Sequence, residues 1–155
     1  MLTGNLPYYV ATPIISRFVL SPQPFSHAVF LIQKEVAERI TAKPGTRDFG
    51  YFSVECQLLA DVQYLFSVAP GAFRPAPKVD SAVIRLTPRS PIAVEKVEGF
   101  LQFASRCFRQ KRKTLRNNLA GSYQLPALPQ LSQRAEQLSV AELIELYAAV
   151  SEPRR

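Results

Sequence analysis

The sequence has few of the residues that disulfides and metal sites require. Among 155 residues there are two cysteines, Cys56 and Cys107, and one histidine, His27. The cysteines form no CxxC pair and lie far apart in the chain, so the sequence indicates no metal centre. Each lies within an apolar pattern with helical spacing. We therefore expect buried free thiols rather than a disulfide.

Long hydrophobic runs are also missing. No apolar run approaches the ~18 residues that a membrane span requires, and the first residues lack the charged start and apolar stretch of a signal peptide. We expect a cytoplasmic protein without a membrane partner. The hydrophobic content of 47% is nevertheless enough for one substantial core, so the length favours one domain or slightly more.

Acidic residues are scarce in one half of the chain. The net charge is +7, and residues 89–155 hold eleven Lys and Arg against six Asp and Glu, whereas residues 1–88 hold eight against six. The segment SRCFRQKRKTLR, residues 105–116, has six basic residues and no acid. A local excess of this kind indicates a polyanionic partner.

The first 88 residues have the hydrophobic patterns of alternating strands and helices. The run HAVFLI is continuously apolar, which predicts a strand buried on both faces of a parallel sheet. The following segments predict further elements: a helix at 33–40, a helix at 51–60, a strand at 62–68, a proline-rich loop at 70–79 and a strand at 81–86. This order is typical of an α/β architecture.

After Pro91 the pattern becomes helical. Apolar residues recur at helical spacing up to Phe108 and resume only at Leu115, so we expect a helix break near residues 110–113. Ser139 is followed three residues later by Glu142, the spacing of a capping box at a helix start. We predict an α/β domain at residues 1–88 and a small all-helical domain at residues 89–155.

The stretch TGNLPYYVATPII predicts a strand end followed by a rigid turn. Pro7 has no N–H and keeps Leu6 extended, which leaves carbonyl groups free, while Asn5 adds a side-chain acceptor and Tyr8 a flat ring. Ligands of open α/β sheets bind beyond the carboxyl ends of strands. Two acceptors beside a ring suit the exocyclic amine of adenine. The alternative is a plain proline turn in which Tyr8 and Tyr9 only pack.

The chain resembles the ribosomal RNA adenine dimethyltransferase family in successive blocks along nearly its whole length. The blocks are NLPY with TPII, QKEVAERI, PGAFRPAPKVDSAVIRL, FRQKRKTLRNNL and RAEQLSVAEL. The resemblance implies the C-terminal part of a Rossmann-like methyltransferase sheet followed by a helical domain. It also implies use of S-adenosylmethionine to dimethylate two adjacent adenosines in small-subunit rRNA, with the pre-ribosomal small subunit as partner.

The resemblance also assigns roles to residues. Asn5 and the Leu6–Pro7 backbone would hold the target amine, Tyr8 would stack on the flipped base, and Asn5 would also lie against the cofactor. Phe73 matches the aromatic residue that closes the other face of the base, although a hydrophobic plug is the alternative. Lys78, in the same loop, is either a phosphate contact or a solvated loop charge.

The basic block matches the family's RNA-binding helical domain. Its candidate contacts are Arg109, Lys111, Arg112, Lys113 and Arg116. A solvated helix face is the usual explanation of a charge run, but such faces normally contain interspersed acids, and this one has none. The block therefore favours RNA, recognised through its shape and backbone.

The sequence departs from the family pattern in its glycines. No two of the six glycines form GxG, so the glycine-rich cofactor turn and an acidic ribose partner have no counterpart. We expect a fragment, inactive alone, whose truncated sheet could favour association. Two alternatives stay open: a non-catalytic RNA-binding or ribosome-assembly factor, and a large-subunit rRNA adenine methyltransferase of the antibiotic-resistance type.

Overall fold

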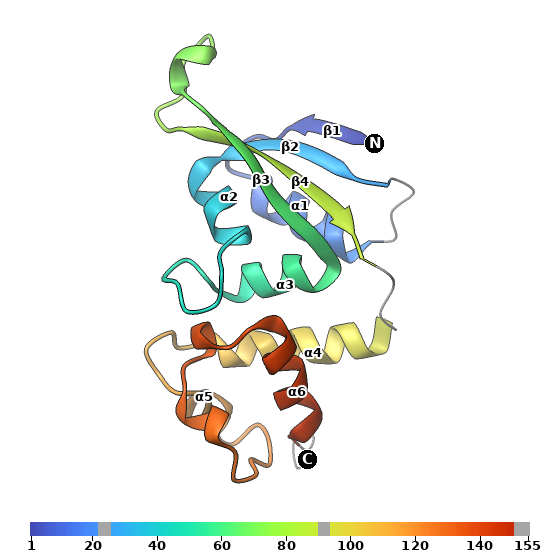
Figure 1. The fold of residues 1–155 in the computed structure, drawn as a ribbon, viewed down its shortest axis with the longest axis vertical. Coiled ribbons are helices and arrows are strands. Elements are labelled where there is room, and N and C mark those ends of the chain that lie inside the picture. The colour runs from blue at the N-terminus through green and yellow to red at the C-terminus, as the bar shows by residue number, and fades with distance from the viewer. Residues whose placement is uncertain (22–25, 90–93, 151–155) are drawn as a thin grey trace. The chain divides into compact units, whose positions relative to one another are not determined.

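The computed structural model describes residues 1–21, 26–89 and 94–150 and divides the chain into two compact units (Figure 1). Unit 1 comprises Met1–Ala42 and Glu55–Ser90, and unit 2 comprises Lys43–Val54 and Pro91–Arg155. The start of the second stretch of unit 2 is close to the expected boundary after residue 88. The inclusion of residues 43–54 in unit 2 was not expected from the sequence. In the described residues, no helix is long and apolar enough to span a membrane.

Unit 1 is built on a four-stranded mixed sheet with the order β1-β2-β4-β3 (Figure 1). The strands are β1 (Leu2–Asn5), β2 (Ala28–Gln33), β3 (Ala60–Val68) and β4 (Ser81–Pro88). β1 pairs parallel to β2, whereas β4 pairs antiparallel to both β2 and β3. An irregularity between Tyr64 and Phe66 shifts the β3–β4 register. The predicted strands are confirmed, and the α/β class with them.

The expectation that the HAVFLI strand is buried on both faces was wrong. In β2, Phe30 and Ile32 are buried, whereas Val29 and Leu31, which point to the opposite face, are only half-buried. The strand is also parallel to only one of its two neighbours. The continuous apolar run therefore belongs to a strand with one face buried under the helices and the other face only partly covered by this chain.

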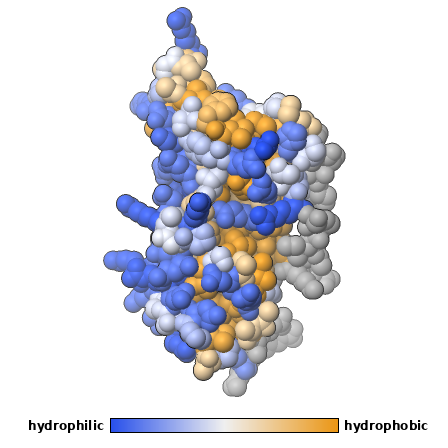
Figure 2. Space-filling model, viewed as in Figure 1, coloured by the Kyte–Doolittle hydropathy of each residue, from blue (hydrophilic) through white to orange (hydrophobic). Residues whose placement is uncertain are grey.

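The helices of unit 1 pack on the buried face of the sheet. Helix α1 (Ala11–Leu20) places the Phe18 ring edge-on against Phe30, with ring centroids 5.5 Å apart. Helix α2 (Lys34–Ile40) buries Val36, Ala37 and Ile40. Helix α3 (Tyr51–Leu59) begins in unit 2 and ends in unit 1. On β3, Leu65 and Phe66 are exposed. The space-filling view shows hydrophobic surface among the hydrophilic surface of the molecule (Figure 2).

Unit 2 consists of helices and short helical turns around an aromatic core. Its elements after residue 90 are α4 (Val94–Cys107), α5 (Leu115–Leu119), η2 (Pro129–Ser132), η3 (Ala135–Gln137) and α6 (Val140–Ala149). The predicted break is confirmed, since α4 ends at Cys107 and α5 begins at Leu115. Ser139 and Glu142 form the predicted capping box at the start of α6. Phe103 is fully buried, and its ring packs with Tyr123 and Tyr147 at centroid distances of 5.4 and 5.3 Å.

Candidate functional site

The turn after β1 has a defined backbone conformation. The buried Leu6 donates its N–H to the Leu31 carbonyl at 3.0 Å, which continues the β1–β2 pairing one residue beyond the strand. Val10 donates its N–H to the Pro7 carbonyl at 3.1 Å, which closes the turn that leads into α1. The Pro7 carbonyl is therefore already engaged. The turn lies at the carboxyl end of β1, as the sequence predicts.

Two acceptors of this turn are unused. The Asn5 side chain is exposed, and neither its amide nor the Leu6 carbonyl has a hydrogen-bond partner in the part of the chain that the structure describes. The hydroxyl of the half-buried Tyr8 forms a hydrogen bond with the Ser81 hydroxyl. The turn thus offers free oxygen atoms next to a ring whose far end is anchored.

Ser81 belongs to the candidate site through its contact with Tyr8, and the sequence did not indicate it. It is the first residue of β4 and is fully buried, so its hydroxyl needs a partner inside the protein. That partner is Tyr8, which lies 73 positions away in the chain. A serine at the start of an otherwise apolar strand was the available signal, because a buried hydroxyl is rarely left unpaired.

The proline-rich loop between β3 and β4 contains the other two candidates of unit 1. It begins with the short turn η1 (Pro70–Ala72), and the half-buried Phe73 donates its N–H to the Pro70 carbonyl at 3.1 Å. Tyr8 and Phe73 make no ring contact with each other in the described residues. Lys78 is exposed and forms no ion pair among those residues.

A shallow hollow lies at the end of β2, where the loop approaches it. Its lining includes Gln33, Glu38 and Val79. Lys34 and Asp80 also line it and are joined twice: the Lys34 N–H donates to the Asp80 carbonyl at 3.0 Å, and the Lys34 ammonium lies 3.8 Å from the Asp80 carboxylate. These contacts hold Asp80, the residue directly before Ser81, against the start of α2.

The basic segment of unit 2 forms a closed turn between α4 and α5. The Asn118 amide donates to the Cys107 carbonyl at 2.8 Å and to the Gln110 carbonyl at 3.1 Å, and its oxygen accepts the Gln110 N–H at 3.1 Å. The Thr114 side chain caps α5 by accepting the Asn117 N–H. Asn118 and Thr114 are therefore occupied in holding the turn.

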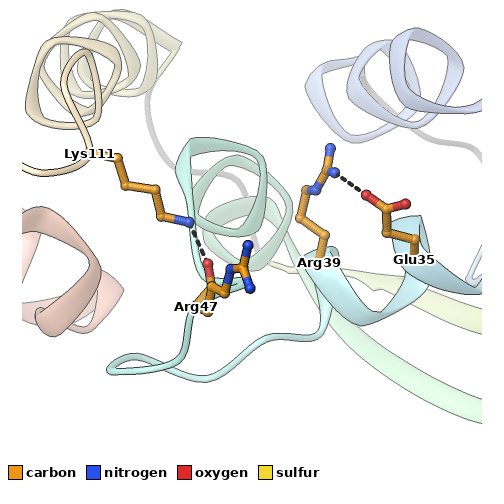
Figure 3. Close-up of polar contacts among 4 residues, drawn as sticks. All are labelled: Glu35, Arg39, Arg47 and Lys111. Atoms are coloured by element: carbon orange, nitrogen blue, oxygen red, sulfur yellow. Dashed lines mark hydrogen bonds and ion pairs between the residues drawn. The ribbon is translucent and has the colours of Figure 1, made fainter.

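The five candidate cations in this segment differ in what they contact. All five are exposed: Arg109, Lys111, Arg112, Lys113 and Arg116. None pairs with a carboxylate in the described residues, whose two ion pairs both lie in unit 1. One of those pairs, Arg39 with Glu35 at 2.9 Å, is drawn in Figure 3. Lys111 differs from the other four cations because its ammonium donates a hydrogen bond to the Arg47 carbonyl (Figure 3).

The cysteines take no part in a reactive site. Both are free and buried, as predicted. Burial raises the pKa of Cys107 to about 12, and burial, with a smaller contribution from the nearby Glu55 carboxylate, raises the pKa of Cys56 further. Both thiols therefore stay protonated near neutral pH. The described residues also contain no group of His, Cys, Asp and Glu side chains that could hold a metal ion.

Comparison with known proteins places these features in one family. Residues 1–149 match the family described as ribosomal RNA adenine dimethylase. The chain is 47% identical over 146 residues to "Ribosomal RNA small subunit methyltransferase A" of Chlorobaculum parvum, covering 93% of this chain and 53% of that protein. The protein of the same name from Geobacillus thermodenitrificans is 43% identical, with 100% of this chain and 50% of that protein covered. The chain thus spans about half the length of these relatives.

Two solved structures share the fold. A dimethyladenosine transferase from Plasmodium falciparum superposes with a TM-score of 0.76 at 25% identity, covering 93% of this chain and 64% of that one. The 23S rRNA methyltransferase ErmE superposes with a TM-score of 0.66 at 22% identity, covering 94% of this chain and 64% of that one. At 22% identity, the ErmE match supports the fold alone.

Proposed function

Because the chain belongs to the ribosomal RNA adenine dimethylase family, we propose that it contributes the target-adenine site and an RNA-binding helical unit to a small-subunit rRNA adenine dimethyltransferase. The observation that supports this most directly is the turn after β1. There the unpaired Asn5 side chain and Leu6 carbonyl lie next to the anchored ring of Tyr8. The basic, acid-free segment of unit 2 supports the RNA-binding role.

The proposed chemistry at the turn concerns the nucleophile. The exocyclic amine of adenine is a poor nucleophile because its lone pair is delocalised into the ring. The Asn5 side-chain oxygen and the Leu6 carbonyl would each accept a hydrogen bond from one N–H group of the amine. This arrangement favours a pyramidal nitrogen, whose lone pair is free to attack the methyl group. The same oxygen atoms would stabilise the positive charge that develops on the nitrogen, and they need no reorganisation to do so.

Tyr8 would bind the base itself. Enzymes that modify a base take it out of the stack and hold it against aromatic side chains. The hydrogen bond to Ser81 limits the rotation of Tyr8, so less side-chain entropy is lost when a base stacks on the ring. Phe73, in the loop before β4, is the proposed second wall of the base site.

The family implies S-adenosylmethionine, whose bound role is to supply an electrophilic methyl group. The residues of this chain fit that cofactor only in part. Asn5 is exposed at the strand end, where it could contact the cofactor, but the sequence has no GxG turn for the rest of the molecule. Calorimetry should therefore show far weaker S-adenosylmethionine binding to this chain than to the full-length C. parvum relative. Equal affinity of the two proteins for S-adenosylmethionine would contradict the conclusion that this chain holds only part of the cofactor site.

Methyl transfer can be tested in a chimera in which this chain replaces the matching part of the C. parvum relative. We expect transfer of labelled methyl groups to small-subunit particles rather than to free large-subunit RNA. Asn5→Ala should reduce the rate by about 10²–10³-fold, the usual effect of removing one preorganised polar contact. Tyr9→Phe is the matched control, since the Tyr9 side chain is 88% exposed. Preferred methylation of large-subunit RNA would instead support an enzyme of the antibiotic-resistance type.

A non-catalytic RNA-binding or ribosome-assembly factor is the second candidate. The exposed, acid-free basic segment of unit 2 is the observation that favours it, because RNA binding needs no methyl transfer. The two candidates differ in the parent reading frame: an enzyme requires a glycine-rich segment upstream of the NLPY block. They differ also in the chimera, because the factor predicts RNA binding without methylation even when that segment is supplied.

A further inference from the structure

The loop formed by residues 43–50, between α2 and α3, is held by contacts within unit 2. The Gly45 N–H donates to the Glu136 carbonyl at 2.7 Å, and Gly45 adopts a positive φ of 83°. The fully buried Phe49 packs edge-on against Phe108, with centroids 6.2 Å apart. The loop is thus attached at both ends, and these contacts account for its place in unit 2.

The third attachment comes from the basic segment. The Lys111 ammonium donates to the Arg47 carbonyl, while the Arg47 guanidinium points away from Lys111 (Figure 3). Arg47 is exposed, and its guanidinium has no hydrogen bond or ion pair in the described residues. Lys111 of the basic turn therefore holds the backbone of Arg47, and the Arg47 side chain is a further unpaired cation.

This arrangement places the Arg47 cation on the backbone stretch that Lys111 contacts. The acid next to it in the chain, Asp48, forms no ion pair in the described residues. Cations without a carboxylate partner attract an anion such as a phosphate group. Each element is held by defined contacts, the basic turn by Asn118 and the 43–50 loop by Gly45 and Phe49. A chain of regularly spaced negative charges fits such a pair of elements better than a single small anion does.

We propose that the 43–50 loop is a second phosphate-contacting element of the RNA-binding surface, with Arg47 as its contact and Lys111 as the residue that positions it. This inference rests on the proposed RNA-binding role of unit 2. It changes the expected role of Lys111, which acts through the Arg47 backbone rather than through a phosphate of its own. Arg112 and Lys113 remain direct contacts.

Salt dependence of RNA binding tests the inference, because its slope counts phosphate contacts. The probe is a fluorescein-labelled RNA hairpin with two adjacent adenosines in its loop, titrated by anisotropy against the full chain at several salt concentrations. Arg47→Ala should lower the slope of log K against log salt by about 0.7–0.9. The side chain is exposed, so this variant should keep its far-UV circular dichroism. An unchanged slope for Arg47→Ala would overturn the proposal.

A double-mutant cycle separates positioning from direct contact. Lys111→Met keeps the aliphatic stem and removes the donor and the charge. We expect it to lower the slope as Arg47→Ala does, and the double variant to lose no more than either single one. Lys111→Arg, which keeps a donor, should behave like the wild type. The matched control is Lys113→Ala, whose effect should add to that of Arg47→Ala. Additive losses for Lys111 and Arg47 would refute the positioning role.

The failure of the inference differs from the failure of the proposed function. If the wild-type chain shows no salt-dependent binding to the hairpin, the RNA-binding role fails, and the inference fails with it. If the chain binds vesicles containing anionic lipid but not the hairpin, the surface is a membrane site and both are overturned. If the wild type binds the hairpin and the Arg47→Ala variant has the same salt slope as the wild type, the inference is refuted while the RNA-binding role stands.

Discussion

The two units of the chain differ in how completely they bury their apolar surface. Unit 1 buries one face of its sheet, and alternate residues on the strands are only half-buried. Unit 2 has a closed core to which α4, α5 and α6 all contribute fully or nearly fully buried side chains. Unit 1 therefore has apolar surface left to cover, whereas the aromatic core of unit 2 is enclosed by its own helices.

The units also differ in where their polar groups are left unpaired. At the turn after β1 in unit 1, the unpaired groups are acceptors, the Asn5 side chain and the Leu6 carbonyl. In unit 2 they are cationic donors on the basic turn and the 43–50 loop. Acceptors suit the N–H groups of a base, and cations suit a phosphate backbone. On the proposed function, the turn of unit 1 would therefore bind the target base, and unit 2 would bind the phosphate backbone of the same RNA.

The largest expected effect tests the closed core of unit 2. Phe103→Ala removes a fully buried ring that packs with three other aromatic side chains, and it should cost about 3–5 kcal/mol of unfolding free energy. Hydrogen exchange of the α4 and α6 amides should accelerate accordingly. Phe66→Ala is the control, because Phe66 is 55% exposed on β3. Similar losses for the two variants would contradict the contrast between the units.

The next prediction concerns the two faces of the sheet. Ile32 is fully buried on β2, and its neighbour Leu31 points to the opposite, half-buried face. Ile32→Ala should cost about 2–5 kcal/mol, and Leu31→Ala less than about half as much. Urea denaturation of the two variants provides the comparison. If Leu31→Ala were as costly as Ile32→Ala, the second face would be covered in solution, for example by a second copy of the chain.

Much of this architecture was predictable from local sequence patterns. Hydrophobic periodicity located the helices and strands, and the spacing of Ser139 and Glu142 located the start of α6. The gap in the apolar stripe after Phe108 indicated the helix break. All of these are signals between residues close in sequence, where 3.6-residue and 2-residue periods apply.

The long-range contacts were not predictable in this way. The HAVFLI pattern could not show that β2 has an antiparallel neighbour, which depends on the distant β4. Nothing near residues 43–50 indicates that they pair with Glu136 and Phe108. The candidate site shows the same limit: the NLPY block revealed free acceptors, but Ser81 as the anchor of Tyr8 required the fold. A charge run likewise gives the sign of the charge and not the partner of Lys111.

A smaller effect is expected at the contact between α4 and α6. A Cβ on Gly99 would overlap the Tyr147 hydroxyl, so Gly99→Ala overpacks this contact. Overpacking costs about 1–3 kcal/mol, and the better helix propensity of Ala offsets about 1 kcal/mol, which leaves a net loss of up to about 2 kcal/mol. Adding Tyr147→Phe should restore most of it. Gly71→Ala, with nothing within 4 Å of the new Cβ, is the control in unit 1.

The smallest expected effect is the acid sensitivity of the α6 cap. The Ser139 N–H and hydroxyl both donate to the Glu142 carboxylate at 2.7 Å, and these bonds lower the pKa of Glu142. A lowered pKa in the folded state means that the cap stabilises unit 2 above the ordinary carboxyl pKa and that this contribution is lost as the pH falls through the folded-state value. Thermal melts should therefore show Glu142→Gln below the wild type at neutral pH and converging with it in acid. Glu145→Gln is the matched control, because Glu145 is exposed on the same helix and accepts no hydrogen bond from the described residues. A constant gap between Glu142→Gln and the wild type at every pH would show that the charge of Glu142 contributes nothing to the cap.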